Sequence, residues 1–339
     1  MPRRPILIDT DTASDDAVAL IMALRSPLVD VRAITVVAGN CSVEQATRNA
    51  LYTAELCGSD VPVYSGATKP LLRELQMAEW FHGKDGLGDH GFTPAIRTSA
   101  AGDAVDVITE TVRTNPGIEI ITLGPLTNLA LALARDPALG QSISRLVVMG
   151  GAPCCEGNVT PAAEFNIWVD PEAARAVFAC GAPIELIGWH LCRHAAVLNQ
   201  QDIDQIHALN TPLAEFAIRC NSTAAVAFQT QTGERGISLP DPVAMSILLD
   251  PTLKLDTSSH YVAIECSSDL TRGMTVVDRL NRSADHRNAA VWSEVLRTSQ
   301  PAEVCWTINV PGWKAALLTA LQATGRDHKD TEKPEKGMS

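Results

Sequence analysis

The sequence predicts an α/β fold, an open and mainly parallel β-sheet flanked by helices, from three observations. Short apolar runs alternate with longer helical patterns over the first 190 residues, as in βαβ units. The runs are continuously apolar, which is typical of parallel strands buried on both faces. Polar or glycine-containing turns follow the runs directly, so we expect these turns to meet at the carboxyl edge of one sheet, where α/β proteins bind ligands.

The expected elements follow the chain in strand–helix order. Four helices carry apolar residues at helical spacing, and five strands are short and rich in Val, Ile and Leu. The turns of interest are 9–16, 39–40, 123–124 and 150–151. The expected strands are residues 5–9, 31–39, 118–124, 145–151 and 183–188, and the expected helices are residues 15–26, 42–58, 125–137 and 170–181.

The second half of the chain has a different pattern. Residues 195–250 are mostly helical by apolar spacing, and we expect this segment to cover the site at the sheet edge. Strand-like runs return between 260 and 310, and residues 311–325 predict a last helix. We therefore expect one domain over residues 1–325, followed by a polar and disordered tail at 326–339.

Composition excludes some classes of function. The chain has 27 basic and 39 acidic residues, a net charge of −12, which argues against a protein that binds nucleic acid through the phosphate backbone. Nine scattered cysteines without a CxxC pair favour reduced thiols. The start lacks the apolar core of a signal peptide, and no apolar run reaches the roughly 18 residues of a membrane span. We expect a cytoplasmic protein without membrane contacts.

The turn after the first strand, "DTDTASDD", places four aspartates within eight residues. Such carboxylates repel one another and raise one another's pKa. A helix N-terminus starting near Asp15 stabilises negative charge there by about 0.3–1 kcal/mol per group. A hard divalent cation with oxygen ligands stabilises it far more. The turn therefore indicates a metal site, the alternative being a helix cap at Asp15 beside solvated aspartates.

A phosphatase of the haloacid dehalogenase type is a second possibility, because "DTD" after a strand nearly fits that family's aspartate pair. Such enzymes also need a lysine and a later acidic pair. The four lysines before the tail, Lys69, Lys84, Lys254 and Lys314, are not in a fitting strand–loop context. We therefore expect this alternative to fail.

Seven ordered motifs carry a resemblance to a known family. They are "DTDTASDDA", "VVAGNCSVEQATRNA", "HGKDGLG", "LGPLTNLALA", "VVMGGA", "GNVTPAAEFNIWVDPEAA" and "LPDPVAM". In these motifs, over most of its length, the chain resembles the inosine-uridine-preferring nucleoside hydrolases. The resemblance implies a Rossmann-like nucleoside hydrolase fold and calcium-dependent hydrolysis of the N-glycosidic bond of ribonucleosides, releasing ribose and a free base.

The resemblance also implies a metal site at the bottom of a pocket. Its Ca²⁺ ligands would be the carboxylates of Asp11, Asp16 and Asp241 and the backbone carbonyl of Leu123. Asp11 would act as the general base for the attacking water. A divalent cation lowers the pKa of a bound water and positions it, so the two roles are compatible.

Polar side chains of the motifs would hold the ribose. A buried polar group without a partner costs about 1–3 kcal/mol, and the sugar hydroxyls would supply such partners. Asp9 would orient the site from behind. The implied ribose-binding residues are Asp15, Asn40, Asn158, Glu164 and Asn166. Outside the resemblance, the "GN" and "AEFN" segments would be taken for loop-forming and capping residues.

Two departures from the family pattern stand out. Thr12-Ala13 replaces the family's Pro-Gly, and Ala adopts φ > 0 only at a cost. Pro240 stands where family members place a histidine linked to protonating the leaving base, or a tryptophan, and proline has no donor. His82 in "FHGKDG" is then the first candidate for activating the leaving group; otherwise it is a structural loop histidine.

Aromatic side chains are candidates for stacking on the nucleobase. Phe165 lies between two of the ribose-binding residues, and Phe228 precedes the last metal ligand. Trp80 and Phe81 are further candidates, and each of these aromatics could instead pack in the core. No role follows from the sequence for Trp189, His190 and His194, and a packed or solvated histidine pair is favoured over a metal site.

Two further alternatives remain open from the sequence. A family relative could hydrolyse another N-riboside, as Pro240 suggests, or the fold could serve as a non-catalytic nucleoside- or ribose-binding protein. The intact metal set argues against the binding protein. The resemblance also implies a homo-oligomer, a dimer or tetramer, and a small nucleoside as the partner molecule.

Overall fold

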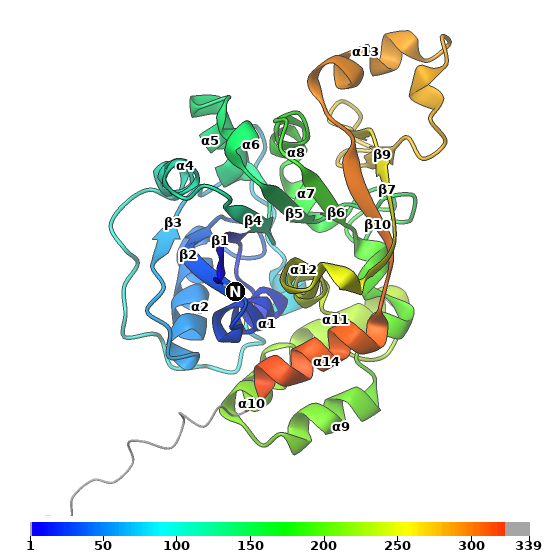
Figure 1. Cartoon of the computed structure of the whole chain (residues 1–339). Helices are drawn as coiled ribbons and strands as arrows, with labels where there is room; N and C mark the ends of the chain where they lie inside the picture. Colours follow the sequence, from blue (N-terminus) through cyan, green and yellow to red (C-terminus); the bar gives the residue numbers. More distant parts are fainter. Residues whose placement is uncertain (1, 323–339) are drawn as a thin grey trace, which may run out of the picture.

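The computed structural model describes residues 2–322 and has an eight-stranded sheet at its centre (Figure 1). The strand order is β3-β2-β1-β4-β5-β6-β10-β7, and all neighbours pair in parallel except β10 and the edge strand β7. A separate antiparallel pair, β8-β9, lies outside this sheet. The predicted open, mainly parallel sheet is therefore confirmed.

The strands are β1 (Arg4–Thr10), β2 (Val29–Val36), β3 (Val63–Ser65), β4 (Glu119–Thr122), β5 (Arg145–Met149), β6 (Ile184–Ile187), β7 (Lys254–His260), β8 (Val262–Ile264), β9 (Thr275–Val277) and β10 (Ala302–Ile308). The longer helices are α1 (Ser14–Arg25), α2 (Val43–Leu56), α4 (Ala104–Thr114), α5 (Thr127–Arg135), α8 (Pro171–Phe178), α9 (Gln200–Ala208), α10 (Pro212–Cys220), α11 (Ser222–Thr232), α12 (Pro240–Leu249), α13 (Ala289–Thr298) and α14 (Val310–Leu321). Short helices include α3 (Glu79–His82), α6 (Leu139–Ser142), α7 (Phe165–Val169) and the 3₁₀ turn η1 (Trp189–Cys192).

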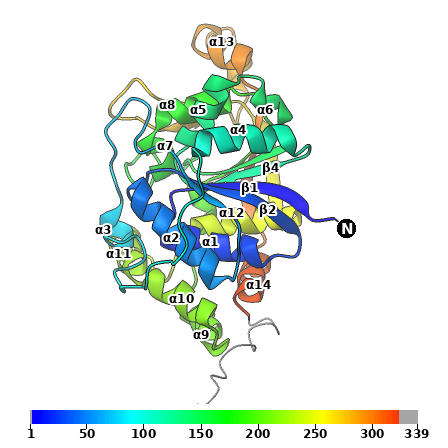
Figure 2. The ribbon, with the colours of Figure 1, turned by 90° about the vertical axis from the view of Figure 1, so that its left-hand side faces the viewer.

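Both faces of the sheet are covered by helices (Figures 1 and 2). Successive strand residues point to opposite faces, so Ile6 and Ile8 of β1 pack in one core and Leu7 packs in the other. The first core contains α1, α2 and α12, and the second contains α4, α5 and α8. Burial on both sides explains why the strands are continuously apolar in sequence.

The second half of the chain shows where the sequence pattern was incomplete. β7 was not predicted, because "KLDTSSH" is mostly polar and exposed, as an edge strand can be. Residues 261–266 and 274–278 contribute to the separate pair β8-β9 instead of the main sheet. The last helix begins at Val310 and ends at Leu321. The rest of the helix predicted to residue 325, and the tail predicted at 326–339, lie outside the described residues.

The segment 195–250 is helical, as predicted. α11 packs against α3, and α12 packs against α1, which brings the starts of α1 and α12 together at the carboxyl edge of the sheet. α9 and α10 lie farther from this edge, with contacts to α14 and α1 (Figure 2). Only part of the helical segment, α11 and the start of α12, therefore borders the site.

Two further expectations can be compared with the structure. All nine cysteines are free thiols, in agreement with the absence of a pairing pattern. Over residues 2–322, none of the helices is both long enough and apolar enough to cross a bilayer.

Candidate active site

The turn between β1 and α1 is closed by Asp16. Its carboxylate accepts hydrogen bonds from the Thr10 hydroxyl, at 2.6 Å, and from the backbone N–H of Ala13, at 3.0 Å. Ala13 has φ −110°, so this turn does not require the positive φ that a glycine would permit. Thr12-Ala13 is thus compatible with an undistorted turn.

Asp11 lies at the centre of this edge and is fully buried. Its Oδ2 accepts a hydrogen bond from the backbone N–H of Asn40, at 2.6 Å, and its Oδ1 has no hydrogen-bond partner among the described residues. A Cβ at Gly39 or Gly124 would come within 2.1 or 2.6 Å of this carboxylate. The "GN" and "LG" turns therefore have glycine because the Asp11 carboxylate lies against their backbone.

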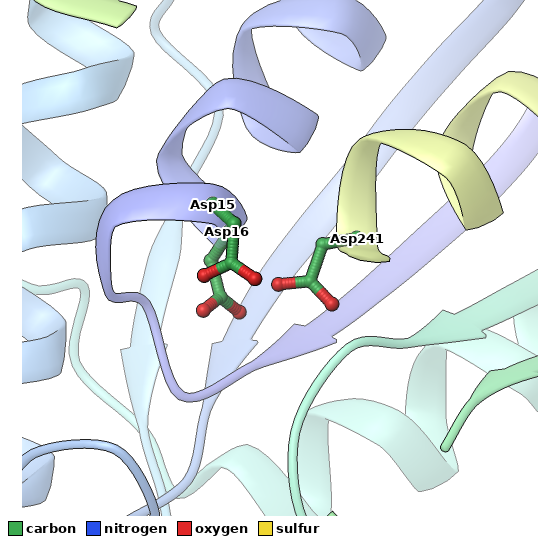
Figure 3. Close-up of side chains that lie close together, drawn as sticks. All are labelled: Asp15, Asp16 and Asp241. Atoms are coloured by element: carbon green, nitrogen blue, oxygen red, sulfur yellow. The ribbon is translucent and has the colours of Figure 1, made fainter. Parts of the chain in front are cut away.

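Asp15, Asp16 and Asp241 form a compact acidic group, with their carboxylates turned toward one another from the starts of α1 and α12 (Figure 3). One carboxylate oxygen of each lies within 4.8 Å of the others, and all three residues are buried. Over residues 2–322, no lysine or arginine forms an ion pair with them. Together with Asp11, we call them the carboxylate cluster.

The electrostatics of the carboxylate cluster follow from burial. Loss of solvation raises the pKa of Asp15 to about 6, and loss of solvation together with the charge of Asp15 raises the pKa of Asp16 to about 6. Burial, followed by neighbouring carboxylates, also raises the pKa of Asp11 and of Asp241 well above the usual range. These groups are stabilised as anions only if positive charge is supplied.

The residues present fit a hard cation. The donors are carboxylate oxygens, the type that Ca²⁺ and Mg²⁺ prefer, and Asp11 Oδ1 and Asp15 Oδ1 are buried without a partner. The structure brings Asp16 and Asp241 together, as predicted, with Asp15 as the third member of the compact group. Asp11 is coupled to this group through its charge. The assignment of Asp11 and Leu123 as ligands stays a prediction.

The predicted ribose-binding residues lie on the walls around this group. Glu164 caps α7, since its carboxylate accepts hydrogen bonds from the backbone N–H groups of Asn166, at 2.9 Å, and Gly151, at 2.7 Å. The Asn166 side chain donates to the Leu123 carbonyl at 2.7 Å. Burial raises the pKa of Glu164 to about 7. Asn158 accepts from the backbone N–H of Phe165 at 2.9 Å.

A cavity opens over the carboxylate cluster. Its lining includes nine of the predicted residues: Asp15, Asn40, His82, Leu123, Asn158, Glu164, Phe165, Asn166 and Asp241. Asp11, Asp16 and Phe228 are not part of the lining. Because Asp11 and Asp16 are adjacent to lining residues but fully buried, they form the floor beneath the cavity.

His82 lies at the end of α3 and is buried. Its Nδ1 is 2.8 Å from the Ser14 hydroxyl and 3.8 Å from Asp15 Oδ1. Loss of solvation lowers the pKa of His82 to about 4, so the imidazole is neutral at pH 7. It can therefore act as a hydrogen-bonding group in the cavity wall, and it brings no positive charge to the cluster.

The aromatic candidates separate into two groups. Trp80, Phe81 and Phe165 line the cavity, and Trp80 is 58% exposed. Phe228 is completely buried, and its ring packs edge-on against Trp189 with centroids 6.2 Å apart. Phe228 therefore supports the cavity wall from behind, and its predicted contact with the base stays a prediction.

Sequence reasoning missed several lining residues. Trp189, separated by one residue from the end of β6, lines the cavity, together with Met149 at the end of β5, Gln231 and Ser238. The position of Trp189 and Met149 at strand ends was the available signal. His190 is half-buried and close to the Cys305 carbonyl, at 3.0 Å, whereas His194 is exposed beside Glu234. The two histidines do not form a metal site.

Asp9 is buried behind the floor. Its Oδ1 accepts hydrogen bonds from the Thr35 hydroxyl, at 2.6 Å, and the Asn128 amide, at 2.8 Å. Asn128 also donates to the Val36 carbonyl. Burial raises the pKa of Asp9 to about 7. These contacts tie the ends of β1 and β2 to α5, which agrees with a supporting position.

Comparisons with known proteins place this geometry in a family. The model of the inosine-uridine preferring nucleoside hydrolases matches residues 6–309. A pyrimidine-specific ribonucleoside hydrolase RihA of Shewanella sp. (strain MR-7) is 40% identical over 291 residues, which cover 85% of this chain and 91% of the relative.

Solved structures agree with this match. The plant nucleoside hydrolase PpNRh1 superposes with a TM-score of 0.88 and 32% identity, covering 95% of this chain and all of that one. A purine-preferring ribonucleoside hydrolase from Gardnerella vaginalis superposes with a TM-score of 0.83 and 30% identity, covering 94% of this chain and 98% of that one.

Proposed function

The chain belongs to the inosine-uridine preferring nucleoside hydrolases, enzymes that hydrolyse ribonucleosides, and we propose that its own substrates are pyrimidine ribonucleosides. The specific name of the 40% identical relative supports this choice of base. The products would be ribose and the free pyrimidine. The observation that carries the proposal is the carboxylate cluster under a cavity whose walls present amide and carboxylate groups to a small polyol.

We propose Ca²⁺ as the cation of the site. Asp16 and Asp241 would hold it, with Asp11 and the Leu123 carbonyl as the other implied ligands and Asp15 as a further neighbour. Four or more oxygen donors suit the high coordination number of Ca²⁺. When bound, the cation supplies positive charge that offsets the buried carboxylates and lowers the pKa of a coordinated water.

Asp11 would accept the proton of the attacking water. Its Oδ1 has no hydrogen-bond partner within residues 2–322, and its Oδ2 is fixed by the Asn40 N–H, so one oxygen is held while the other is available. Cleavage at C1′ develops oxocarbenium character. Asp15, Glu164 and the nearby amides would bind the ribose hydroxyls and position C1′ above Asp11.

The leaving base requires another group. Pro240 lines the cavity at the start of α12, and it offers neither a proton nor an N–H. His82 is neutral by its lowered pKa, so it would assist as a hydrogen-bond donor through whichever ring nitrogen carries the proton. A hydrolase that acts on another N-riboside is the second candidate, and Pro240 is the observation that favours it.

One assay tests the proposal. The protein with Ca²⁺ would be incubated with uridine, cytidine, inosine, adenosine and nicotinamide riboside, and free ribose would be measured. We expect ribose from uridine or cytidine first. Release from only nicotinamide riboside would support the second candidate. Absence of ribose from every riboside by protein that binds Ca²⁺ would contradict hydrolase activity and support a binding protein.

Two properties beyond the reaction are also proposed. The nine free cysteines support a reducing compartment, and we place the enzyme in the cytoplasm. We also expect a homo-oligomer, a dimer or a tetramer, as the family resemblance implies. Sedimentation velocity would test the second point, and a monomer at micromolar concentration would contradict it.

A further inference from the structure

Trp189 has a property that the reaction as derived above does not use. It is the first residue of η1, separated by one residue from the end of β6 at Ile187, and is only 3% exposed, yet it is one of the residues that line the active-site cavity. The indole Nε1–H has no acceptor among the described residues. A buried N–H without an acceptor is unfavourable, and an acceptor supplied by the substrate would remove this cost.

An unpartnered indole is not by itself evidence of a site. Trp313 of α14 is also completely buried with an unpartnered Nε1–H, but it lies in the core and not on the cavity wall. The combination of an unpartnered donor and a place in the wall is therefore what sets Trp189 apart. It also makes Trp313 a matched control.

The surroundings of Trp189 indicate which atom it meets. Its backbone N–H donates to the Gly151 carbonyl at 2.9 Å, and the Gly151 N–H donates to Glu164 at 2.7 Å. Through Gly151, Trp189 and Glu164 are fixed to the same corner of the cavity. Phe228 supports the indole from behind, and the Arg193 guanidinium lies 5.7 Å from its ring centroid.

The two side chains in this corner offer complementary chemistry. Ionised Glu164 can only accept a hydrogen bond, whereas the Trp189 indole can only donate one. A hydroxyl group both donates and accepts, so one alcohol can pair with both. A base carbonyl can only accept, so it could pair with the indole N–H but not with the carboxylate.

We propose that Trp189 is a substrate-binding residue whose Nε1–H donates a hydrogen bond to a ribose hydroxyl, the one that donates to Glu164. Of the ribose hydroxyls, the 5′-hydroxyl is assigned, because the 2′- and 3′-hydroxyls are adjacent on the ring and suit the paired carboxylates of Asp15 and Asp241. The inference rests on the proposed function and adds a specificity-determining contact to it.

The test compares two substrates in two variants. With Ca²⁺ present, kcat/KM would be measured for uridine and 5′-deoxyuridine in the wild type, W189F and W313F, and the uridine:5′-deoxyuridine ratio would be calculated for each. One lost hydrogen bond corresponds to about a tenfold change, so W189F should lower the ratio about tenfold. W313F should leave the ratio at the wild-type value.

The outcomes separate the two proposals. If the wild type releases ribose from no riboside, the proposed function fails before Trp189 is tested. If the wild type is active and W189F lowers kcat/KM by the same factor for both substrates, the indole has only a structural role or contacts the base. The inference is then overturned. An unchanged ratio with unchanged rates overturns it as well.

A second measurement covers the case in which W189F does not fold. In ¹⁵N-tryptophan-labelled wild type with Ca²⁺, one indole N–H resonance should shift downfield on addition of ribose, and 5-deoxyribose should not shift it. The resonance should persist in W80F, which removes the exposed tryptophan at the cavity. If no indole resonance responds to saturating ribose, the hydrogen bond is absent.

Discussion

Buried acidic residues lie at both ends of the central strands, but only those at one end have basic side chains as partners. At the carboxyl ends, the carboxylate cluster has no lysine or arginine in an ion pair within residues 2–322. At the amino ends, acidic and basic side chains alternate in what we call the ion-pair network, which consists of Arg4, Glu119, Arg145, Glu185, Lys254 and Glu303.

The ion-pair network contains its own counter-charges. Arg145 contacts Glu119 at 3.1 Å and Glu185 at 2.8 Å, and it donates to the Ile247 and Leu248 carbonyls at the end of α12. Hydrogen bonds and charge from Arg145 lower the pKa of Glu185 in spite of its burial. In the carboxylate cluster, burial raises every pKa. Buried charges that are paired with opposite charges of the same chain thus stabilise the fold, whereas buried charges without such partners indicate a site for a ligand of opposite charge.

The largest effect is expected from Asp11→Asn. Removing the proposed proton acceptor should lower kcat for ribose release about a thousandfold, while the loss of one repelling charge leaves the protein folded. Glu185→Gln is the matched change in the ion-pair network, and its kcat should equal that of the wild type. Steady-state ribose assays on folded protein measure both, and a Glu185→Gln enzyme as inactive as Asp11→Asn would contradict the division of roles.

The second effect concerns pH and cations. Asp15 and Asp16 titrate near 6 when folded and near 3.8 when unfolded, so the folded state binds more protons between these values. Without divalent cations, the free energy of unfolding should therefore fall as pH rises from about 4 to 7, by on the order of 5 kcal/mol for the two groups. Urea unfolding in EDTA at several pH values measures this change.

Saturating Ca²⁺ supplies the comparison for this experiment. The cation binds the deprotonated carboxylates and competes with protons, so it should stabilise the protein more at pH 7 than at pH 5. Asp241→Asn should reduce both the pH dependence and the Ca²⁺ effect. Stability in EDTA that rises between pH 4 and 7 would show that the cluster is neutralised from within the chain.

The sequence predicted the residues on the floor of the cavity better than those on its walls. Asp9, Asp11, Asp15 and Asp16 lie in one turn after a strand, and the sheet rule places that turn at the ligand-binding edge. Asp241 lies 225 residues beyond Asp16, and its place beside it depends on how α12 packs against α1. That contact is tertiary, so only the family resemblance could predict it.

The walls were less predictable for a physical reason. Trp189 and Phe228 are both aromatic residues near the predicted site, but composition does not show which one faces the cavity and which one supports it. In the structure, Trp189 lines the cavity, and Phe228 is completely buried behind it. Similarly, β7 is polar because an edge strand is partly solvated, so its sequence lacks the apolar run that identified the central strands.

The third effect tests the ion-pair network itself. Arg145→Met leaves Glu119 with Arg4 and Glu185 with Lys254 as the remaining basic partner, and partly buried charges that lose a partner are costly. The free energy of unfolding should fall by about 2 kcal/mol, with kcat unchanged. Arg113→Met, which removes an exposed pair with Asp136, is the control and should cost less than about 1 kcal/mol. Equal losses would show that the network is no more than a set of surface pairs.

The smallest effect is expected from His82, which among residues 2–322 is the basic side chain that lies against the carboxylate cluster. Its pKa is lowered to about 4 by burial, so it is neutral throughout the range in which the enzyme would be assayed. His82→Gln should lower kcat/KM about tenfold, the value of one or two hydrogen bonds, without changing the shape of the pH profile above pH 6. If the wild-type profile has a step near pH 6.5 that His82→Gln removes, His82 is charged near neutrality. The carboxylate cluster would then be partly neutralised by a charged side chain of the chain, as the carboxylates of the ion-pair network are.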